Sequence, residues 1–284
     1  MTLYVDDFLL TGASTKVLAH LRKLLQPRFA LNDLGQASFV SGMAVHHEKE
    51  ESTIRISQDS YTKSVLTRFG MGKSKPVSTP GVGKEFPRQS IGATYLDEEG
   101  TTRYQEIVGL LICIVQCTRY DIAYSVQYLT RFMSKPATVH MEAAKRVLRY
   151  LRDQTAFKLK YKTGNFNLHG FCDANHAAET ERGRSCSGII FFLAGAPISF
   201  ASSLQKTAAQ STMEAELSAL SFASREAIYL SGLLSEIGFR HLQLPEIWCD
   251  NLSALHVAAN NSFSALGKHV ALKYHRLKDW MVGL

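Results

Sequence analysis

The sequence is poor in cysteine and has no long hydrophobic run. Its five cysteines are scattered in apolar surroundings: Cys113, Cys117, Cys172, Cys186 and Cys249. An odd, dispersed set without a CxxC pair argues against a disulfide framework or a thiolate zinc cage, and predicts reduced thiols packed in a core. A signal peptide and a run of about 18 apolar residues, which a membrane helix needs, are both missing. We therefore expect an intracellular protein without a membrane partner.

Acidic residues are outnumbered by basic ones. Lys and Arg total 32 against 25 Asp and Glu, which gives a net charge of +7 in a chain of 284 residues. This charge suits a polyanionic partner such as nucleic acid, although many soluble proteins are equally basic. The length is sufficient for two domains, each with its own core.

Three stretches in the second half place an acidic residue at a predicted element boundary. They read GFCDANHA at 170–177, STMEAELSAL at 211–220 and IWCDN at 247–251. Asp173 ends a hydrophobic run, and Asp250 ends a short predicted strand. Between them, two apolar segments within 186–200, broken by Gly-Ala-Pro, predict antiparallel strands.

A long helix is predicted before the last of these strands. Apolar residues recur at helical spacing from Ser211 until Gly238, where the helix should end, and Ser211 or Thr212 is the expected N-cap. A second helix follows Asp250. Three strands, a long helix, a strand ending in Asp and another helix predict an α/β fold with a mixed sheet.

This order resembles the ribonuclease H domain of copia-type retrotransposons. The resemblance implies that Asp173, Glu216 and Asp250 are the catalytic residues and hold Mg²⁺ or Mn²⁺. Glu216 is preferred to Glu214 because Glu-Leu-x-Ala at 216–219 matches the segment around the family's catalytic Glu. Two residues away on a helix, Glu214 would point about 200° from Glu216.

Clustered carboxylates suit this chemistry for a physical reason. Phosphodiester hydrolysis needs an activated water and a stabilised leaving oxyanion, and two divalent ions roughly 4 Å apart supply both. Mg²⁺ prefers oxygen ligands. Any one of these acids alone would more often be structural, but three in the expected order favour catalysis. The implied substrate is an RNA–DNA hybrid, recognised by its shape and its 2′-hydroxyls.

One segment departs from the family. Residues 268–271 read KHVA, so Ala271 stands where the family usually has Asp or Glu. The chain also reaches Leu284 before the family's segment like Gln-Leu-Ala-Asp. A fourth catalytic carboxylate is thus missing, and Asp279 is best interpreted as a solvated acid. These departures support the alternative of a catalytically inactive remnant that at most binds nucleic acid.

The N-terminus resembles motif C of reverse transcriptases. It reads MTLYVDDFLLTG, with Asp6 and Asp7 at the tip of two short predicted strands. In that family the acid pair holds the ions that position a 3′-hydroxyl and a triphosphate. The other polymerase elements would lie before Met1, so we expect that the chain alone does not polymerise DNA.

The following segments predict a helix at 14–29, with its leucines facing a core, and a hairpin at 45–56. His46 and His47 lie beside three glutamates, which raises the alternative of a metal site. Adjacent strand residues face opposite ways, so a solvated hairpin is favoured.

Three helices are predicted between residues 104 and 154. On the third, Lys145, Arg149 and Arg152 are spaced as a basic stripe that could follow a phosphate backbone. A solvated face explains the stripe equally well.

The resemblance extends from Leu3 to Asp279 and implies four segments. These are the C-terminal part of a reverse transcriptase at 1–70, with palm and thumb elements, a linker at 71–103, a helical connection at 104–165 and a C-terminally truncated ribonuclease H-like domain at 166–284. Motifs interrupted at both ends predict an internal piece of a retrotransposon polyprotein. The family implies nucleic acid, an RNA–DNA hybrid and other polyprotein parts as partners. It also implies a cytoplasmic location in virus-like particles, with the nucleus as an alternative.

Overall fold

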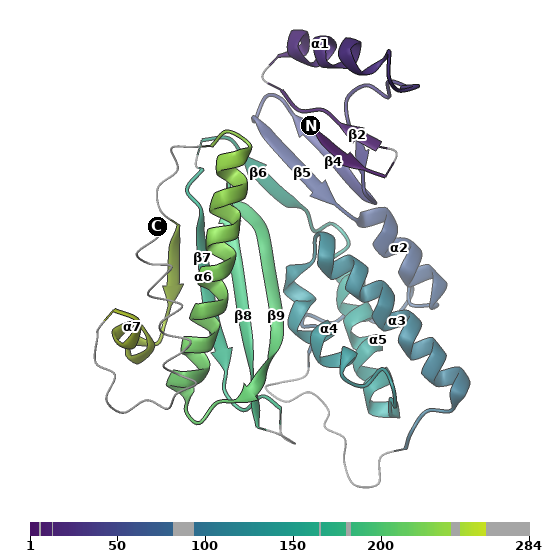
Figure 1. The fold of residues 1–284 in the computed structure, drawn as a ribbon. Helices are drawn as coiled ribbons and strands as arrows, with labels where there is room; N and C mark the ends of the chain where they lie inside the picture. The colour runs from purple at the N-terminus through teal and green to yellow at the C-terminus, as the bar shows by residue number, and fades with distance from the viewer. Residues whose placement is uncertain are drawn as a thin grey trace.

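The computed structural model describes residues 1–5, 7–12, 14–81, 94–164, 166–179, 183–239 and 245–259. Within this part, the strands form three sheets, and two hydrophobic clusters form the cores. One core lies among the helices in the middle of the chain, and the other lies between the long helix α6 and the sheet behind it (Figure 1). The expected α/β architecture is therefore confirmed.

The N-terminal segment forms a small hairpin and a helix. Its elements are β1 (Thr2–Tyr4), β2 (Asp7–Leu9) and α1 (Thr15–Leu25). The hairpin confirms the two short strands, but Asp6 lies outside the described residues. Ser14 caps α1 by accepting a hydrogen bond from the Val17 N–H. The expectation that its leucines face a core is wrong for the described structure. No residue of α1 is buried, and Leu24 is exposed.

The second sheet joins segments that lie far apart in the sequence. Its order is β3-β4-β5-β6, formed by β3 (Phe39–Val40), β4 (Met43–Glu48), β5 (Thr53–Ser57) and β6 (Leu159–Lys162). The pairing of β4 with β5 confirms the hairpin predicted at 45–56. The antiparallel pairing of β5 with β6 brings the segments on either side of the predicted linker into one sheet.

The helices in the middle of the chain form a separate hydrophobic core. It is formed by α2 (Asp59–Arg68), α3 (Glu98–Cys117), the 3₁₀ turn η1 (Tyr120–Ile122), α4 (Ala123–Thr130) and α5 (Thr138–Asp153). Helix α3 begins before residue 104, because the Asp97 carboxylate caps it by accepting from the Gly100 N–H. The prediction of core cysteines is wrong for Cys113, which is exposed on this helix.

The third sheet carries the acidic residues. Its strands are β7 (His169–Asn175), β8 (Arg184–Leu193), β9 (Ala196–Ala208) and β10 (Glu246–Cys249), in the order β10-β7-β8-β9. Neighbours from β7 to β9 are antiparallel, whereas β10 is parallel to β7. Ala194 and Gly195 both have positive φ and join β8 to β9 in a two-residue hairpin, which confirms the meander.

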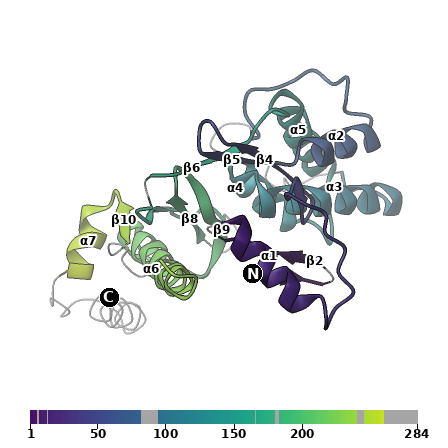
Figure 2. The ribbon, with the colours of Figure 1, turned by 90° about the horizontal axis from the view of Figure 1, so that it is seen from above.

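Helix α6 (Thr212–Glu236) lies across the face of this sheet, and α7 (Leu252–Ala259) packs beside it (Figures 1 and 2). The Ser211 cap of α6 confirms the predicted start of this helix, and Gly238, at φ 104°, follows its end. Gly170 allows the sheet to pack closely, since an added Cβ would lie 2.5 Å from the Phe191 ring. No helix in the described ranges is both long and apolar enough to cross a bilayer.

Candidate active site

Two parallel strands bring Asp173 and Asp250 to the same level of the sheet. Strands β7 and β10 pair in register, with Phe171 opposite Trp248 and Cys172 opposite Cys249. An aspartate follows each of these cysteines, so the two neighbouring segments repeat the same aromatic–Cys–Asp triplet. Both aspartates are exposed to solvent. The pairing of these strands therefore places the two aspartates next to each other, at the solvent-exposed C-terminal ends of β7 and β10.

Glu216 reaches these strand ends from helix α6. It lies in the second turn after the Ser211 cap, and only 7% of the residue is exposed. Its Oε1 accepts a hydrogen bond from the Ala174 N–H at 3.2 Å, directly beside Asp173. Its Oε2 is buried and has no hydrogen-bond donor among the described residues. An unsatisfied carboxylate oxygen is costly to bury, so this atom is suited to bind a positively charged group.

The electrostatic setting of Glu216 agrees with that geometry. Burial, together with the nearby charges of Asp173 and Asp250, raises the pKa of this carboxyl to about 7. The Ala174 N–H lowers the pKa but does not compensate for burial. Three carboxyl groups close enough to repel one another are an arrangement that a divalent cation would stabilise.

Glu214 lies on the same helix but has a different partner. It is also buried, and its Oε2 accepts a hydrogen bond from the Gln210 N–H at 2.8 Å. The Ser211 hydroxyl in turn accepts from the Glu214 N–H, so Glu214 takes part in capping the helix. Of the two glutamates, Glu216 is the one that the structure brings to Asp173.

Cys249 is a member of the cluster that the sequence analysis did not include. Ligand atoms of Glu216, Cys249 and Asp250 all lie within 4.8 Å of one another. The Cys172 thiol is hydrogen-bonded to the sulfur of Cys249, and burial raises the pKa of both thiols. The repeated Cys-Asp dipeptide at the ends of two predicted strands was the available signal. It was hidden because buried cysteines are usually packing residues.

The predicted basic stripe makes contacts within the chain itself. Arg149 Nε donates to the Lys75 carbonyl at 2.6 Å, and Arg152 Nε donates to the Gly72 carbonyl at 3.0 Å. Arg152 also donates to the Ser74 carbonyl. Lys145 is exposed. Two of the three cations thus hold the segment after α2 against helix α5.

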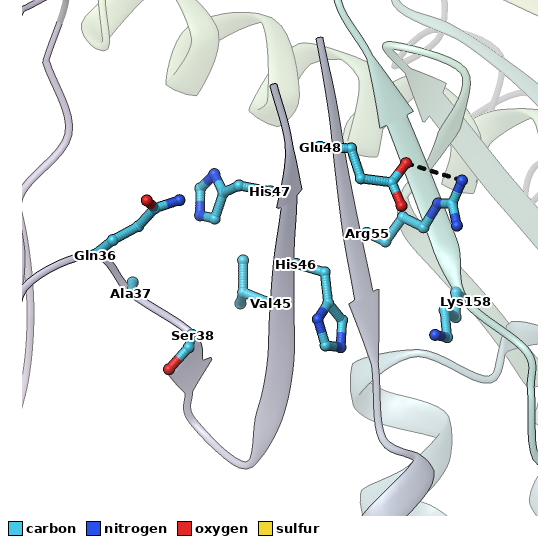
Figure 3. A pocket seen from close by; sticks show the side chains of 9 residues that line it. All are labelled: Gln36, Ala37, Ser38, Val45, His46, His47, Glu48, Arg55 and Lys158. Carbon is cyan, nitrogen blue, oxygen red and sulfur yellow. Dashed lines mark ion pairs between the residues drawn. The ribbon is translucent and has the colours of Figure 1, made fainter. Parts of the chain in front are cut away.

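The two histidines considered as an alternative metal site point to opposite sides of β4. Figure 3 shows His47 directed toward Gln36, and His46 on the side of Arg55 and Lys158, in an open cavity of about 510 Å³. In the same cavity, Glu48 forms an ion pair with Arg55 at 2.9 Å. Within the described ranges, the group of potential metal ligands is Glu216, Cys249 and Asp250, and neither histidine belongs to it.

The remaining predicted site residues are only partly described. Asp7 is exposed at the start of β2, opposite Tyr4 in the N-terminal hairpin. Asp6, Ala271 and Asp279 lie outside the described residues.

Comparison with known proteins shows similarity to retrovirus-related Pol polyproteins of transposons. The profile of the family described as reverse transcriptase (RNA-dependent DNA polymerase) matches residues 1–83. The Pol polyprotein of transposon TNT 1-94 from Nicotiana tabacum is 36% identical over 98% of this chain, and that of transposon RE2 from Arabidopsis thaliana is 34% identical over 98%. Ribonuclease H1 from the archaeon Halobacterium salinarum is 14% identical. It matches with a TM-score of 0.31 over 42% of this chain and 79% of its own.

The chain belongs to the copia-type retrotransposon Pol polyprotein family. It spans only part of those relatives, 21% of the tobacco polyprotein and 19% of the Arabidopsis polyprotein.

Proposed function

We propose that this chain hydrolyses the RNA strand of RNA–DNA hybrids, with Asp173, Glu216 and Asp250 holding Mg²⁺ or Mn²⁺. The observation that carries the proposal is the convergence of three carboxylates from three elements around the unpaired Oε2 of Glu216. Membership of the Pol polyprotein family supports nucleic acid as the substrate class.

The donor set fits a hard divalent ion. Carboxylate oxygens are the ligands that Mg²⁺ and Mn²⁺ prefer, and the buried Oε2 of Glu216 lacks any other counter-charge among the described residues. When bound, such ions activate a water molecule and stabilise the departing oxyanion.

The three residues differ in what they contribute. Glu216 is buried and tied to the Ala174 N–H, so it provides the fixed inner wall of the site. Asp173 and Asp250 are exposed, so their carboxylates face the side from which a nucleic acid can approach. Asp173 lies on β7 and Asp250 directly follows β10, so the in-register pairing of these strands largely sets the spacing of the two aspartates.

A second candidate is a catalytically inactive remnant that only binds nucleic acid. Ala271, in the place of a usual acid, favours this alternative. Three carboxylates would then bind a divalent ion, but hydrolysis would be slow or absent for want of the fourth.

The first test is cleavage of a labelled RNA–DNA hybrid by the purified chain with Mg²⁺ or Mn²⁺. We expect metal-dependent cleavage that falls at least about 100-fold in Asp173→Asn and in Glu216→Gln, because each removes a ligand. Glu214→Gln is the matched control, a buried glutamate on the same helix that should keep its activity.

Three outcomes decide between the candidates. Equal losses in Glu214→Gln and Glu216→Gln would reject the assignment of Glu216. Cleavage that survives Asp173→Asn would point to a contaminating nuclease. No cleavage by a chain that is folded and binds Mn²⁺ would establish the inactive alternative. In the same assays, template-directed nucleotide incorporation should be absent.

A further inference from the structure

The site contains a sulfur ligand that hydrolysis with Mg²⁺ does not need. The Cys249 side chain lies on the face of β10 that is turned toward α6, as does Cys172 on β7. Glu216 enters from α6 on the same side. As a result, one thiol and two carboxylates, from α6 and from the C-terminal end of β10, lie within 4.8 Å of one another.

We propose that Glu216, Cys249 and Asp250 form a binding site for a thiophilic divalent cation, of the class of Zn²⁺, Cd²⁺ or Co²⁺. The inference shares two carboxylates with the proposed function, but it does not require the chain to be a nuclease. Geometry and donor chemistry both support it.

The buried oxygen of Glu216 points to a cation at this place. The residue is more than nine-tenths buried, and its Oε2 has no hydrogen-bond donor in the described part of the chain. A cation bound between this oxygen, Asp250 and Cys249 would satisfy it. The neighbouring strands fix two of the three ligands, because Cys249 and Asp250 are consecutive at the end of β10.

The sulfur decides which cations bind best. Mg²⁺ prefers oxygen ligands, so a thiol adds little to its affinity. Zn²⁺ and Cd²⁺ bind thiolate strongly, so the sulfur should raise their affinity for this site. On binding, the Cys249 thiol releases its proton to the buffer, and the sulfur then coordinates the cation. The Cys172 thiol, which is hydrogen-bonded to Cys249, acts as a positioning group for that sulfur.

The site therefore selects between two kinds of cation. A thiophilic ion would occupy the oxygens of Glu216 and Asp250 that the proposed function assigns to Mg²⁺. The two kinds of cation should therefore compete for these oxygens, and the thiophilic ion should bind more tightly.

The test is a Cd²⁺ titration of the reduced full-length chain in a phosphine reductant, without nucleic acid. Calorimetry measures the affinity, and ultraviolet absorption reports the charge-transfer band of the cadmium–thiolate bond. We expect one tight site with this band in the wild type. Cys249→Ser should lose the band and weaken Cd²⁺ binding about 10-fold or more, while Mn²⁺ affinity changes little. Cys113→Ser, an exposed cysteine on α3, is the control and should behave as the wild type.

A band that persists in Cys249→Ser would overturn the inference, as would the lack of a tight Cd²⁺ site in the wild type. If circular dichroism shows that Cys249→Ser is unfolded, Glu216→Gln decides. It keeps every thiol and should still weaken Cd²⁺ binding, so unchanged affinity would also overturn the site. Because no substrate is present, a failure here does not depend on whether the chain cleaves RNA–DNA hybrids.

Discussion

Glu216 is the residue whose environment departs most from that of an ordinary glutamate. A buried carboxylate with one unsatisfied oxygen and two acidic neighbours is destabilising when ionised and unaccompanied. Such a residue is retained where its charge has a use, and a cation is the simplest partner for it. The carboxyl group that suggests a function should therefore also affect the free energy of unfolding.

We expect the metal-free protein to lose stability as the pH rises from about 4.5 to about 7. The pKa of Glu216 rises to about 7 in the folded chain from the ordinary value of 4.5, so the folded state keeps a proton that the unfolded chain releases between these values. The full shift corresponds to about 3 kcal/mol. Water reaches the two exposed aspartates beside it, so a loss of about 1–2 kcal/mol is expected.

Urea denaturation in a chelating buffer at several pH values measures this effect. Glu216→Gln should remove most of the decline, since glutamine does not titrate, whereas Glu214→Gln should retain it. An identical pH dependence in the wild type and Glu216→Gln would show that another group titrates. Addition of Mn²⁺ at pH 7.5 or so should raise the stability of the wild type through binding to the folded state alone.

At the scale of elements, a buried arginine ties the 3₁₀ turn η1 to the end of α5. Arg119 is only 3% exposed and contacts both carboxylate oxygens of Asp121, at 2.9 and 2.7 Å. Its guanidinium also donates to the Gln154 carbonyl and lies 4.8 Å from the centre of the Phe157 ring. The Tyr150 hydroxyl donates to Asp121 at 2.8 Å, which completes the cluster. The Arg119 guanidinium thus holds η1 against the C-terminal end of α5.

Arg119→Met should lower the free energy of unfolding by about 3 kcal/mol, because it leaves the Asp121 carboxylate without its charge partner. Arg68→Met is the control. Its ion pair with Glu106, at 3.1 Å, is exposed and should contribute at most about 1 kcal/mol. Urea denaturation of both variants at neutral pH gives the comparison. Losses of equal size would mean that burial does not strengthen the Arg119 cluster.

At the scale of the whole molecule, segments before residue 82 and after residue 93 share both a sheet and a core. Strand β5 pairs with β6 along four residue pairs, from Thr53 with Lys162 to Ile56 with Leu159. Val65, Leu66 and Phe69 of the first segment are buried in the same cluster as residues of α3 and α5. Two parts of the chain with such an interface should not separate when the connection between them is cut.

We therefore expect a chain cleaved at a protease site inserted between Gly83 and Lys84 to remain a single species in size-exclusion chromatography. The pairing of β5 with β6 and the shared apolar core hold the fragments together. Leu66→Asp in the cleaved chain is the control, and it should release the fragments because it buries an unpaired charge. Dissociation of the unmutated cleaved chain would show that the two segments fold as independent units.

Much of the local structure followed from the sequence. The start of α6 at its Ser211 cap, the strand at 246–249 and the hairpin between β4 and β5 were predicted, because caps, turns and side-chain periodicity act over a few residues. The resemblance of Glu-Leu-x-Ala at 216–219 to the family's segment favoured Glu216 over Glu214, and the structure brings Glu216 to Asp173. The cap, the strand and the hairpin depend mainly on neighbours along the chain.

Only the tertiary structure decided the rest. The register of β7 against β10 added Cys249 to the carboxylates, and the packing of α5 on residues 72–75 gave Arg149 and Arg152 partners within the chain. No residue of α1 is buried, so its leucines lack the core that its pattern predicted. In the first two cases the deciding contact joins segments distant in sequence, and in all three the energy of burial or pairing depends on which surfaces meet.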